Sequence, residues 1–377
     1  MIDEKDSSSL EDRLRAKIKQ KDTIIDDKNI LHAITGQVET TIGSFHVLST
    51  ELSNTDKINN IKARLGIGRD DYCVPTGIYA IGTPDNDSPV LVTANYKLTI
   101  DMLRIELAGL DIWILVIDTN GVNVWCSAGK RTFSTEEIIY RIQKYKLKKL
   151  VSHNQIILPQ LSAPGISAYQ ITKYTGFKAV YGPVYARDIK EFLKQGCIKT
   201  EKMKKVHFNL SDRLTVSPIE FIMNLKYLAF IFIFFLILQL ISGENKDFIH
   251  VAEGGFFNTI PYLIALFTGT ILFPALLPIL PFRMFSVKSI ILGIVWSSVV
   301  IKYSSAFYFD SNIMVYTGNT LILIAAICFL SMNFTGSTTF TSLSGVKKET
   351  GLMLPLLAVF STLGIILMIA EKIIAII

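Results

Sequence analysis

The chain has 377 residues, a mean hydropathy of +0.40 and a hydrophobic fraction of 50%, which is too apolar for one soluble globule. Its net charge is +6, and of its 38 basic and 32 acidic residues only 15 follow position 218. A charged first part therefore precedes an apolar second part. Lysines cluster shortly before the first apolar segment, and this cluster indicates membrane topology rather than nucleic-acid binding: Lys199, Lys202, Lys204 and Lys205.

The four cysteines lie far apart in sequence, at Cys73, Cys126, Cys197 and Cys328. This spacing excludes a local zinc knuckle, a CxxC redox pair and an iron-sulfur ligand run. The N-terminus lacks the apolar core of a secretory signal, so we expect the first part to stay in the reducing cytosol.

Residues 1–36 are interpreted as a charged N-terminal segment, a frayed helix or a tail, before an α/β domain over residues 37–210. Periodicity and turn residues predict a hairpin, then strands that alternate with short helices, which favours a mostly parallel, Rossmann-like sheet covered on both faces. The predicted elements are a hairpin over 37–49, strands over 78–81, 89–95, 110–118, 156–159 and 179–181, and helices over 54–65, 98–107, 135–146, 167–174 and 186–195.

Residues 211–377 carry five apolar runs, each close to the length of about 20 residues that spans a bilayer: 222–241, 257–280, 289–309, 313–334 and 353–370. Lys and Arg counts place the first domain on the cytoplasmic side and the C-terminus outside. Few ionisable residues lie within the runs, so we interpret them as an anchor or docking surface rather than a transport path. Three prolines are expected to break the second helix, namely Pro274, Pro278 and Pro281. The polar segment 335–345 reads as a flexible linker.

The stretch Asn123–Lys130 (NVWCSAGK) places Cys126 after a buried strand and before the helix that Ser134 to Glu137 begin. Open α/β sheets bind ligands at the carboxyl ends of their strands, where Cys126 should lie. From the residues alone, three interpretations stay open: a small buried thiol, a reactive nucleophile, since a helix N-terminus favours thiolate, or a metal ligand.

Other common sites are excluded by pattern. The segment that ends at Gly129 and Lys130 fails the phosphate-loop pattern, because Val124 replaces its first glycine and Arg131 its Ser or Thr. The nucleophile elbow of hydrolases is absent from the sequence. His153 lies beside a strand end, but it has no partner nearby in sequence and is interpreted as structural.

The motif NVWCSAGK closely resembles the cap-helix motif of the mercury-methylating membrane corrinoid proteins (the HgcA family), whose usual form is N-[VI]-W-C-[AS]-[AS]-G-K. Further similar stretches occur in the same order, with a membrane tail of five helices at the end: 89–97 (PVLVTANYK), 121–130, 153–165 and 181–184. The soluble domain of that family is similar to the corrinoid-binding part of the corrinoid iron-sulfur proteins of acetyl-CoA synthesis.

The resemblance implies that Cys126 is the lower axial ligand of a corrinoid cobalt, with the cofactor's own base displaced. It implies a cap that packs against the corrin, formed by Asn123, Val124, Trp125, Ser127, Ala128 and Gly129, with Lys130 orienting the cap or meeting a corrin side chain. Small residues suit a flat macrocycle that must approach the backbone closely. At other strand ends, further expected cofactor contacts are Thr93, Asn95, Gln160 and Gly165.

The activity that the resemblance implies is transfer of a methyl group from methyl-cobalt(III) to Hg(II), giving methylmercury. A thiolate is a strong, soft donor that favours this step. The implied partners are a ferredoxin-like protein with two [4Fe-4S] clusters as electron donor and a methyltetrahydrofolate-linked methyl donor. Two alternatives stay open: a membrane-anchored corrinoid methyl carrier of one-carbon metabolism, and a corrinoid-binding membrane protein without turnover.

Overall fold

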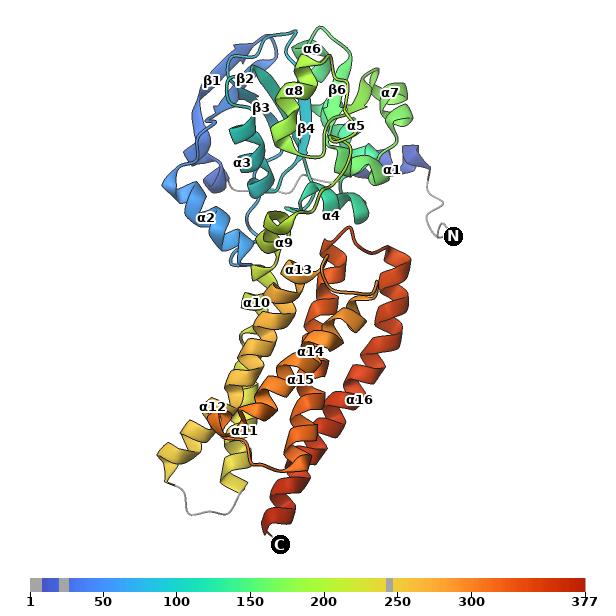
Figure 1. Ribbon diagram of the computed structural model, residues 1–377. Helices are drawn as coiled ribbons and strands as arrows, with labels where there is room; N and C mark the ends of the chain where they lie inside the picture. Colours follow the sequence, from blue (N-terminus) through green and yellow to red (C-terminus); the bar gives the residue numbers. More distant parts are fainter. Residues whose placement is uncertain (1–8, 20–26, 242–246, 377) are drawn as a thin grey trace. The chain divides into compact units, whose positions relative to one another are not determined.

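The computed structural model describes residues 9–19, 27–241 and 247–376 (Figure 1). The chain divides into two compact units, which are described separately here. The first unit comprises residues 1–63 and 67–206, and the second comprises residues 64–66 and 207–377.

The first unit is built on a seven-stranded mixed sheet with the order β1-β2-β3-β5-β4-β6-β7. The strands are β1 (Ile34–Thr40), β2 (Gly43–Leu48), β3 (Gly77–Ile81), β4 (Val90–Ala94), β5 (Ile112–Ile117), β6 (Gln155–Leu158) and β7 (Lys178–Tyr181). Strands β5, β4, β6 and β7 are mutually parallel, whereas β1 pairs antiparallel with β2 and β3 pairs antiparallel with β5. The chain moves from β4 to β5 on one side and then to β6 on the other, which makes the carboxyl edge of β4 a topological switch point.

Both faces of the sheet are apolar, as the alternation of side chains along β5 shows. Trp113, Leu115 and Ile117 contribute to one hydrophobic cluster, and Ile112 and Ile114 contribute to the other. A strand buried on both faces reads as a continuous apolar run because its side chains point alternately to opposite sides. All six residues of β5 are buried.

Helices cover the two faces of the sheet (Figure 1). One face packs against α3 (Lys97–Glu106) and α8 (Ile189–Lys194). The other packs against α1 (Leu10–Lys19), α5 (Thr135–Lys144) and α7 (Ala168–Thr175). The remaining elements of this unit are α2 (Asn54–Arg64), α4 (Val124–Gly129), α6 (Leu147–Leu150) and the short 3-10 helices η1 (Asp27–Asn29), η2 (Leu31–Ala33), η3 (Gln160–Gly165) and η4 (Ala186–Asp188). The predicted α/β class with a sheet covered on both faces is confirmed.

Two features of this unit were left undetermined by the sequence predictions. The predicted strand over 78–81 runs antiparallel to β5, because the chain enters β3 from the edge at which β4 and β5 end. Within the charged N-terminal segment, residues Leu10–Lys19 form a helix whose Leu10 and Leu14 pack into the core. The sequence shows a high charge density there, but two leucines one turn apart suffice to dock one face of a helix.

The second unit is helical. Its elements are α9 (Leu210–Val216), α10 (Pro218–Asn224), α11 (Tyr227–Ile241), α12 (Phe248–Phe267), the π-helical turn η5 (Thr268–Leu272), α13 (Phe273–Leu276), α14 (Phe285–Lys302), η6 (Ser304–Phe307), α15 (Ile313–Asn333), η7 (Phe334–Ser337) and α16 (Leu343–Ile376). Within the described residues, four helices are long and apolar enough to cross a membrane, at Phe248–Leu276, Phe285–Lys302, Ile313–Asn333 and Ser344–Ala375. A fifth span is present if the bent pair Leu210–Asn224 and Tyr227–Ile241 counts as one.

The first predicted span, over 222–241, is not one straight helix. A bend of 44° separates Leu210–Asn224 from Tyr227–Ile241. Helix α11 has 15 residues, about 22 Å at 1.5 Å per residue, which is short of the roughly 30 Å of a hydrocarbon core. The hydropathy of a segment therefore located the apolar residues but not the bend.

The second span ends at Leu276, before Pro278 and Pro281, as expected, but Pro274 does not break it. Pro274 lies within α13, two residues after the π-helical turn η5, so the helix continues through it. A proline is tolerated where the register of helical hydrogen bonds changes, since the donor that it lacks has no regular partner there. The span also begins at Phe248, before the apolar run, because hydrogen bonding continues beyond the most apolar residues.

Close helix packing in this unit depends on glycines. A Cβ at Gly318 of α15 would lie 2.8 Å from the carbonyl oxygen of Gly364 in α16. A Cβ at Gly293 of α14 would lie 3.0 Å from Cα of Ile324 in α15. Small residues allow helix backbones to approach closely, which is the usual means of helix association in a lipid environment.

Candidate functional site at the carboxyl edge of the sheet

Cys126 lies in a short helix of its own. The sequence placed it in a connection before the next helix, but residues Val124–Gly129 form α4, between β5 and α5. The side-chain oxygen of Asn123 accepts a hydrogen bond of 2.9 Å from the backbone N–H of Cys126, which is a standard N-cap. The motif therefore encodes its own helix start, and the Cys126 side chain is exposed.

Helix α4 has a buried face and an exposed face. Val124, Ser127 and Ala128 are buried, and the Ser127 hydroxyl donates to the carbonyl of Val124 at 3.0 Å. The carbonyl of Ser127 in turn accepts from the backbone N–H groups of Thr132 and Phe133, at 2.9 and 3.2 Å. This face anchors the helix to the unit.

The exposed face presents the groups that a ligand can reach. Trp125 is 39% exposed, and Cys126, Gly129 and Lys130 are also exposed. A Cβ at Gly129 would meet no atom within 4 Å, so the space beside this glycine is open. An exposed thiol, an aromatic ring and an unobstructed backbone therefore lie together on one short helix.

Gly165, which follows β6, the next strand along the chain, supports α4. It ends η3, which follows β6 and packs against α4. A Cβ at Gly165 would lie 2.8 Å from the carbonyl oxygen of Phe133 and 3.1 Å from that of Ala128. The Gly165 segment therefore lies beside α4, and the glycine is required because backbone occupies the place of a side chain.

Asn95 is fully buried and holds the loop between β5 and α4. Its amide oxygen accepts hydrogen bonds from the backbone N–H groups of Thr119 and Gly121, at 3.0 and 3.1 Å, and lies 2.8 Å from the Thr119 hydroxyl. Its amide nitrogen donates to Asp118 at 3.3 Å. All of these contacts are made inside the protein, so the Asn95 side chain stabilises the loop that leads to α4.

The other expected contact residues occupy different environments. Thr93 is buried within β4 and is 2% exposed. The side-chain oxygen of Gln160 accepts a hydrogen bond from the ammonium group of Lys199, whose pKa is lowered by burial and then by the charge of Lys204. His153 uses both ring nitrogens structurally: Nε2 lies 2.9 Å from the carbonyl oxygen of Ser88, and Nδ1 accepts from the backbone of Gln155 at 3.2 Å.

Cys73 was not expected near this site. A Cβ at Gly121 would lie 3.3 Å from Cβ of Cys73, which places the thiol beside the loop that leads to α4. The pKa of Cys73 is raised, first by burial and then by the negative charges of Asp118 and Asp71. The backbone of Cys73 bridges to Tyr96, next to Asn95, but a single long-range bridge leaves no sequence pattern by which to find it.

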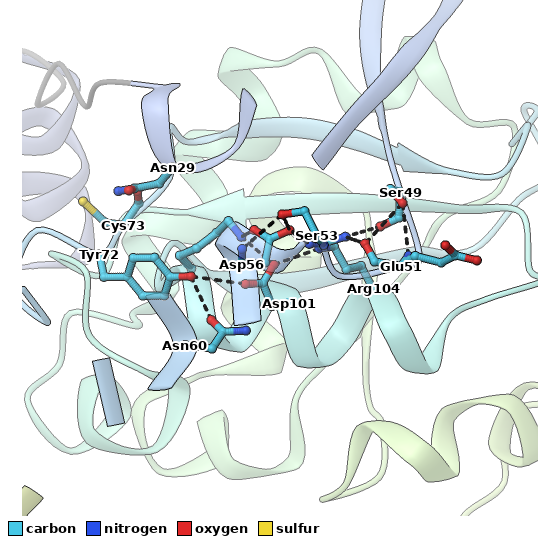
Figure 2. A network of polar contacts seen from close by, with 11 residues as sticks. Asn29, Ser49, Glu51, Ser53, Asp56, Asn60, Tyr72, Cys73, Asp101 and Arg104 are labelled. Atoms are coloured by element: carbon cyan, nitrogen blue, oxygen red, sulfur yellow. Dashed lines mark hydrogen bonds and ion pairs between the residues drawn. The ribbon is translucent and has the colours of Figure 1, made fainter. Parts of the chain in front are cut away.

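A buried charge network, drawn in Figure 2, joins α2 to α3. The ammonium group of Lys97 lies 2.7 Å from Asp56 and 2.6 Å from Asp101, and the guanidinium of Arg104 lies 2.8 Å from each carboxylate. All four side chains are almost completely buried, and their charges sum to zero. Burial alone would raise the pKa of Asp56, but hydrogen bonds and charge from Lys97, with Ser53 and Arg104, lower it to about 2.

The network also positions the start of α3, which follows directly from β4 and Asn95. Arg104 donates to the backbone carbonyls of Ser49 and Glu51, both at 2.6 Å, and so ties the segment before α2 to α3. Fixed charge pairs of this kind hold one arrangement of helices because breaking any pair leaves an uncompensated buried charge. Among the described residues, no three His, Cys, Asp or Glu side chains form a group that could hold a metal ion.

The α/β unit is similar to proteins of known complexes. Residues 68–193, from before β3 into α8, match the family model of the CO dehydrogenase/acetyl-CoA synthase delta subunit. The acetyl-CoA decarbonylase/synthase complex subunit gamma of Methanopyrus kandleri is 33% identical over 137 residues, which are 36% of this chain and 29% of the relative.

Two further relatives have similar names. The subunit gamma of Archaeoglobus fulgidus is 32% identical over 124 residues, 32% of this chain and 26% of the relative. The subunit gamma 2 of Methanosarcina thermophila is 34% identical over 99 residues, 25% of this chain and 21% of the relative. The chain thus spans less than a third of the length of these relatives. The match to the family model, over residues 68–193, includes Cys126.

Proposed function

We propose that residues 37–210 bind a corrinoid and that the sulfur of Cys126 would ligate its cobalt in place of the cofactor's own base. The observation that carries this proposal is the exposed Cys126 thiol on a helix whose open face has Trp125 and Gly129. The likeness to acetyl-CoA decarbonylase/synthase subunits and the motif of residues 123–130 support it. The donor set fits a metal held mainly by a macrocycle, which needs only one further ligand from the protein on this side.

The residues of the site divide into two groups by burial. Trp125, Gly129 and Lys130 are exposed and are proposed to meet the corrin, with Gln160 and Gly165 at its rim. The others hold α4 and the adjoining strand ends in place, and we propose that they act by positioning: Asn123, Val124, Ser127, Ala128, Thr93 and Asn95.

Cys126 is proposed to tune the metal as well as hold it. When bound, the corrinoid supplies a cobalt ion on which a methyl group can be carried and passed to an acceptor. The thiolate of Cys126 is a strong, soft donor, and the N-cap at Asn123 keeps its backbone in one orientation. Asn95 and Gly165 keep the helix itself in place.

The function that the comparisons favour is that of a membrane-anchored corrinoid methyl carrier of one-carbon metabolism, because the relatives are named as subunits of acetyl-CoA decarbonylase/synthase complexes. A second function, with Hg(II) as the methyl acceptor, is favoured by one specific observation. The motif Asn123–Lys130 resembles that of mercury-methylating proteins. For that activity Hg(II), a soft thiophilic cation, is the substrate and methylmercury the product. The two functions share the same cofactor site and differ only in the methyl acceptor.

The helical unit is proposed to anchor the chain in the cytoplasmic membrane, in contact with the lipid bilayer. Arg283, in the loop before α14, and Lys347 and Lys348, near the start of α16, would face the cytoplasm together with the first unit, and the C-terminus would lie outside. We further propose that a ferredoxin-like protein with two [4Fe-4S] clusters supplies electrons and that a methyltetrahydrofolate-linked donor supplies the methyl group. Nucleic acid is not a proposed partner.

The proposal is tested by reconstituting the purified full-length protein, in detergent or nanodiscs, with aquocobalamin. Wild type should show the visible spectrum of a cysteine-ligated, base-off corrinoid, and Cys126→Ala should lose it. Cys197→Ala is the matched control, since this thiol lies elsewhere in the same unit. An unchanged spectrum in Cys126→Ala would show that the sulfur is not the ligand.

The acceptor is decided in a single-turnover assay with the isotopically labelled methylcorrinoid bound to the protein. Hg(II), a thiol and a nickel complex are offered separately, and transfer of label to each is measured. Preferential formation of methylmercury supports mercury methylation, whereas transfer to the thiol or to nickel supports the one-carbon carrier. Binding of the cofactor without transfer to any acceptor would contradict both.

A further inference from the structure

A hydrogen-bonded loop connects the carboxyl end of β5 to the helix that carries Cys126. Residues 118–121 form this loop, and two of them have positive φ angles, 56° at Asn120 and 67° at Gly121. Asparagine and glycine adopt the left-handed region more readily than other residues, so the sequence allows this turn, and contacts from other segments then hold it in place.

One side chain makes most of those contacts. Asn95 reaches the loop from the end of the neighbouring strand β4, and its amide oxygen receives the N–H groups of Thr119 and Gly121 as well as facing the Thr119 hydroxyl. The Thr119 hydroxyl also lies 2.7 Å from the carbonyl oxygen of Val122, one residue before the cap Asn123. These contacts connect Asn95 through Thr119 to Val122, which directly precedes the N-cap of α4.

A second contact holds the loop from the other side. The backbone N–H of Asp118 donates to Glu137 of α5 at 2.9 Å. Glu137 is itself fixed, because it is 1% exposed and forms ion pairs with Arg141 and Lys17. The loop is thus held between a buried amide and a buried carboxylate, and both groups make their contacts within the protein.

We infer that Asn95 is a positioning residue for Cys126: it sets the path of residues 118–121 and through them the place of the thiol, without contacting a ligand itself. This inference rests on the proposed function, in which the Cys126 sulfur ligates cobalt. It assigns Asn95 a role different from the direct cofactor contact expected from the sequence, since the side chain is 0% exposed.

The inference is tested first on the full-length protein without cofactor, by hydrogen exchange at the amides of residues 119–122. Asn95→Ala removes three acceptor contacts, and exchange should accelerate about 10- to 100-fold, as expected when one or two net hydrogen bonds are lost. Thr119→Val removes only the hydroxyl and should accelerate it less. Asn60→Ala is the matched control, because this buried asparagine in α2 accepts a hydrogen bond from Tyr72 at 2.8 Å and none from the loop.

A second readout is the spectrum after addition of aquocobalamin. Asn95→Ala should show a smaller fraction of cysteine-ligated corrinoid than wild type, whereas Asn60→Ala should match wild type. Wild-type exchange at residues 119–122 together with a wild-type spectrum in Asn95→Ala overturns the inference. Should Asn95→Ala fail to fold, Thr119→Val decides: acceleration confined to 119–122 supports the inference, and unchanged exchange overturns it.

The two proposals fail in different ways. If wild type binds no corrinoid through Cys126, the proposed function is wrong, but accelerated exchange in Asn95→Ala still shows that Asn95 sets the loop. If wild type has the cysteine-ligated spectrum and Asn95→Ala changes neither spectrum nor exchange, the proposed function stands and the positioning role is wrong.

Discussion

Two glycines near Cys126 should respond to the same substitution in opposite ways. In Gly165→Ala the added Cβ would lie 2.8 Å from the carbonyl oxygen of Phe133 and 3.1 Å from that of Ala128, so it is about 0.6 and 0.3 Å inside a contact of 3.4 Å. Both neighbours are backbone atoms, which cannot rotate away as a flexible side chain would. Overpacking of this kind costs about 1–3 kcal/mol, and because Ala128 belongs to α4, the helix itself should be displaced.

Gly129→Ala places its Cβ in open space on the exposed face of the same helix. Without cofactor, this substitution should be neutral or stabilise the protein by about 0.4–1 kcal/mol, because alanine restricts the unfolded chain. With a corrin packed against that face, the methyl group should weaken binding about tenfold, which corresponds to about 1.4 kcal/mol.

The assay combines hydrogen exchange in α4 of the cofactor-free protein with a titration by aquocobalamin. Gly165→Ala should accelerate exchange and weaken binding, whereas Gly129→Ala should only weaken binding. Gly36→Ala, where a Cβ would also meet nothing within 4 Å, is the control and should change neither. Wild-type exchange in Gly165→Ala, or wild-type affinity in Gly129→Ala, would refute the reasoning from these contacts.

Two further predictions concern the buried charges between α2 and α3. Lys97→Met leaves Arg104 as the only cation paired with Asp56 and Asp101 in this network. It should destabilise the first unit by about 3–5 kcal/mol, measured by hydrogen exchange of α3. Adding Asp101→Asn should recover part of this loss, and an absence of recovery would contradict the charge imbalance as its cause. The pKa of Asp56 is lowered to about 2 from its usual 3.8, so its contribution of about 2 kcal/mol is present above pH 4 and lost as the pH falls from 4 to 2. Asp56→Asn should flatten that part of the stability-pH curve, and equal slopes in both proteins would count against the assignment.

Local patterns in the sequence predicted the elements well. The apolar run of β5 and the alternation of strands with short helices led to the covered α/β sheet, and hydropathy located the apolar helices. The features that the sequence left undetermined depend on long-range contacts. The antiparallel β3 depends on the edge from which the chain enters the sheet, and α1 depends on docking through Leu10 and Leu14.

The candidate site shows the same division. The motif itself indicated Cys126, but the sequence placed this residue in a connection, and only the structure shows that Asn123 is the N-cap of a short helix that carries it. The hydrogen bonds of Asn95 to the loop 118–121 connect the ends of two different strands. The proximity of Cys73 to Gly121 likewise connects segments that are 48 residues apart in the sequence. A side chain's exposure at such positions depends on what packs over it, and periodicity carries no information about that.

By itself, then, the sequence determined an α/β part followed by an apolar helical part, and a cysteine motif at the end of a buried strand. These features follow from hydrophobic periodicity, segment length and capping residues, which act over a few neighbouring residues. Only the tertiary structure decided that Cys126 is exposed on its own short helix, that Gly165 meets Ala128, and that Asn95 is a buried support. Those outcomes depend on contacts between distant segments, whose geometry is set when the sheet assembles.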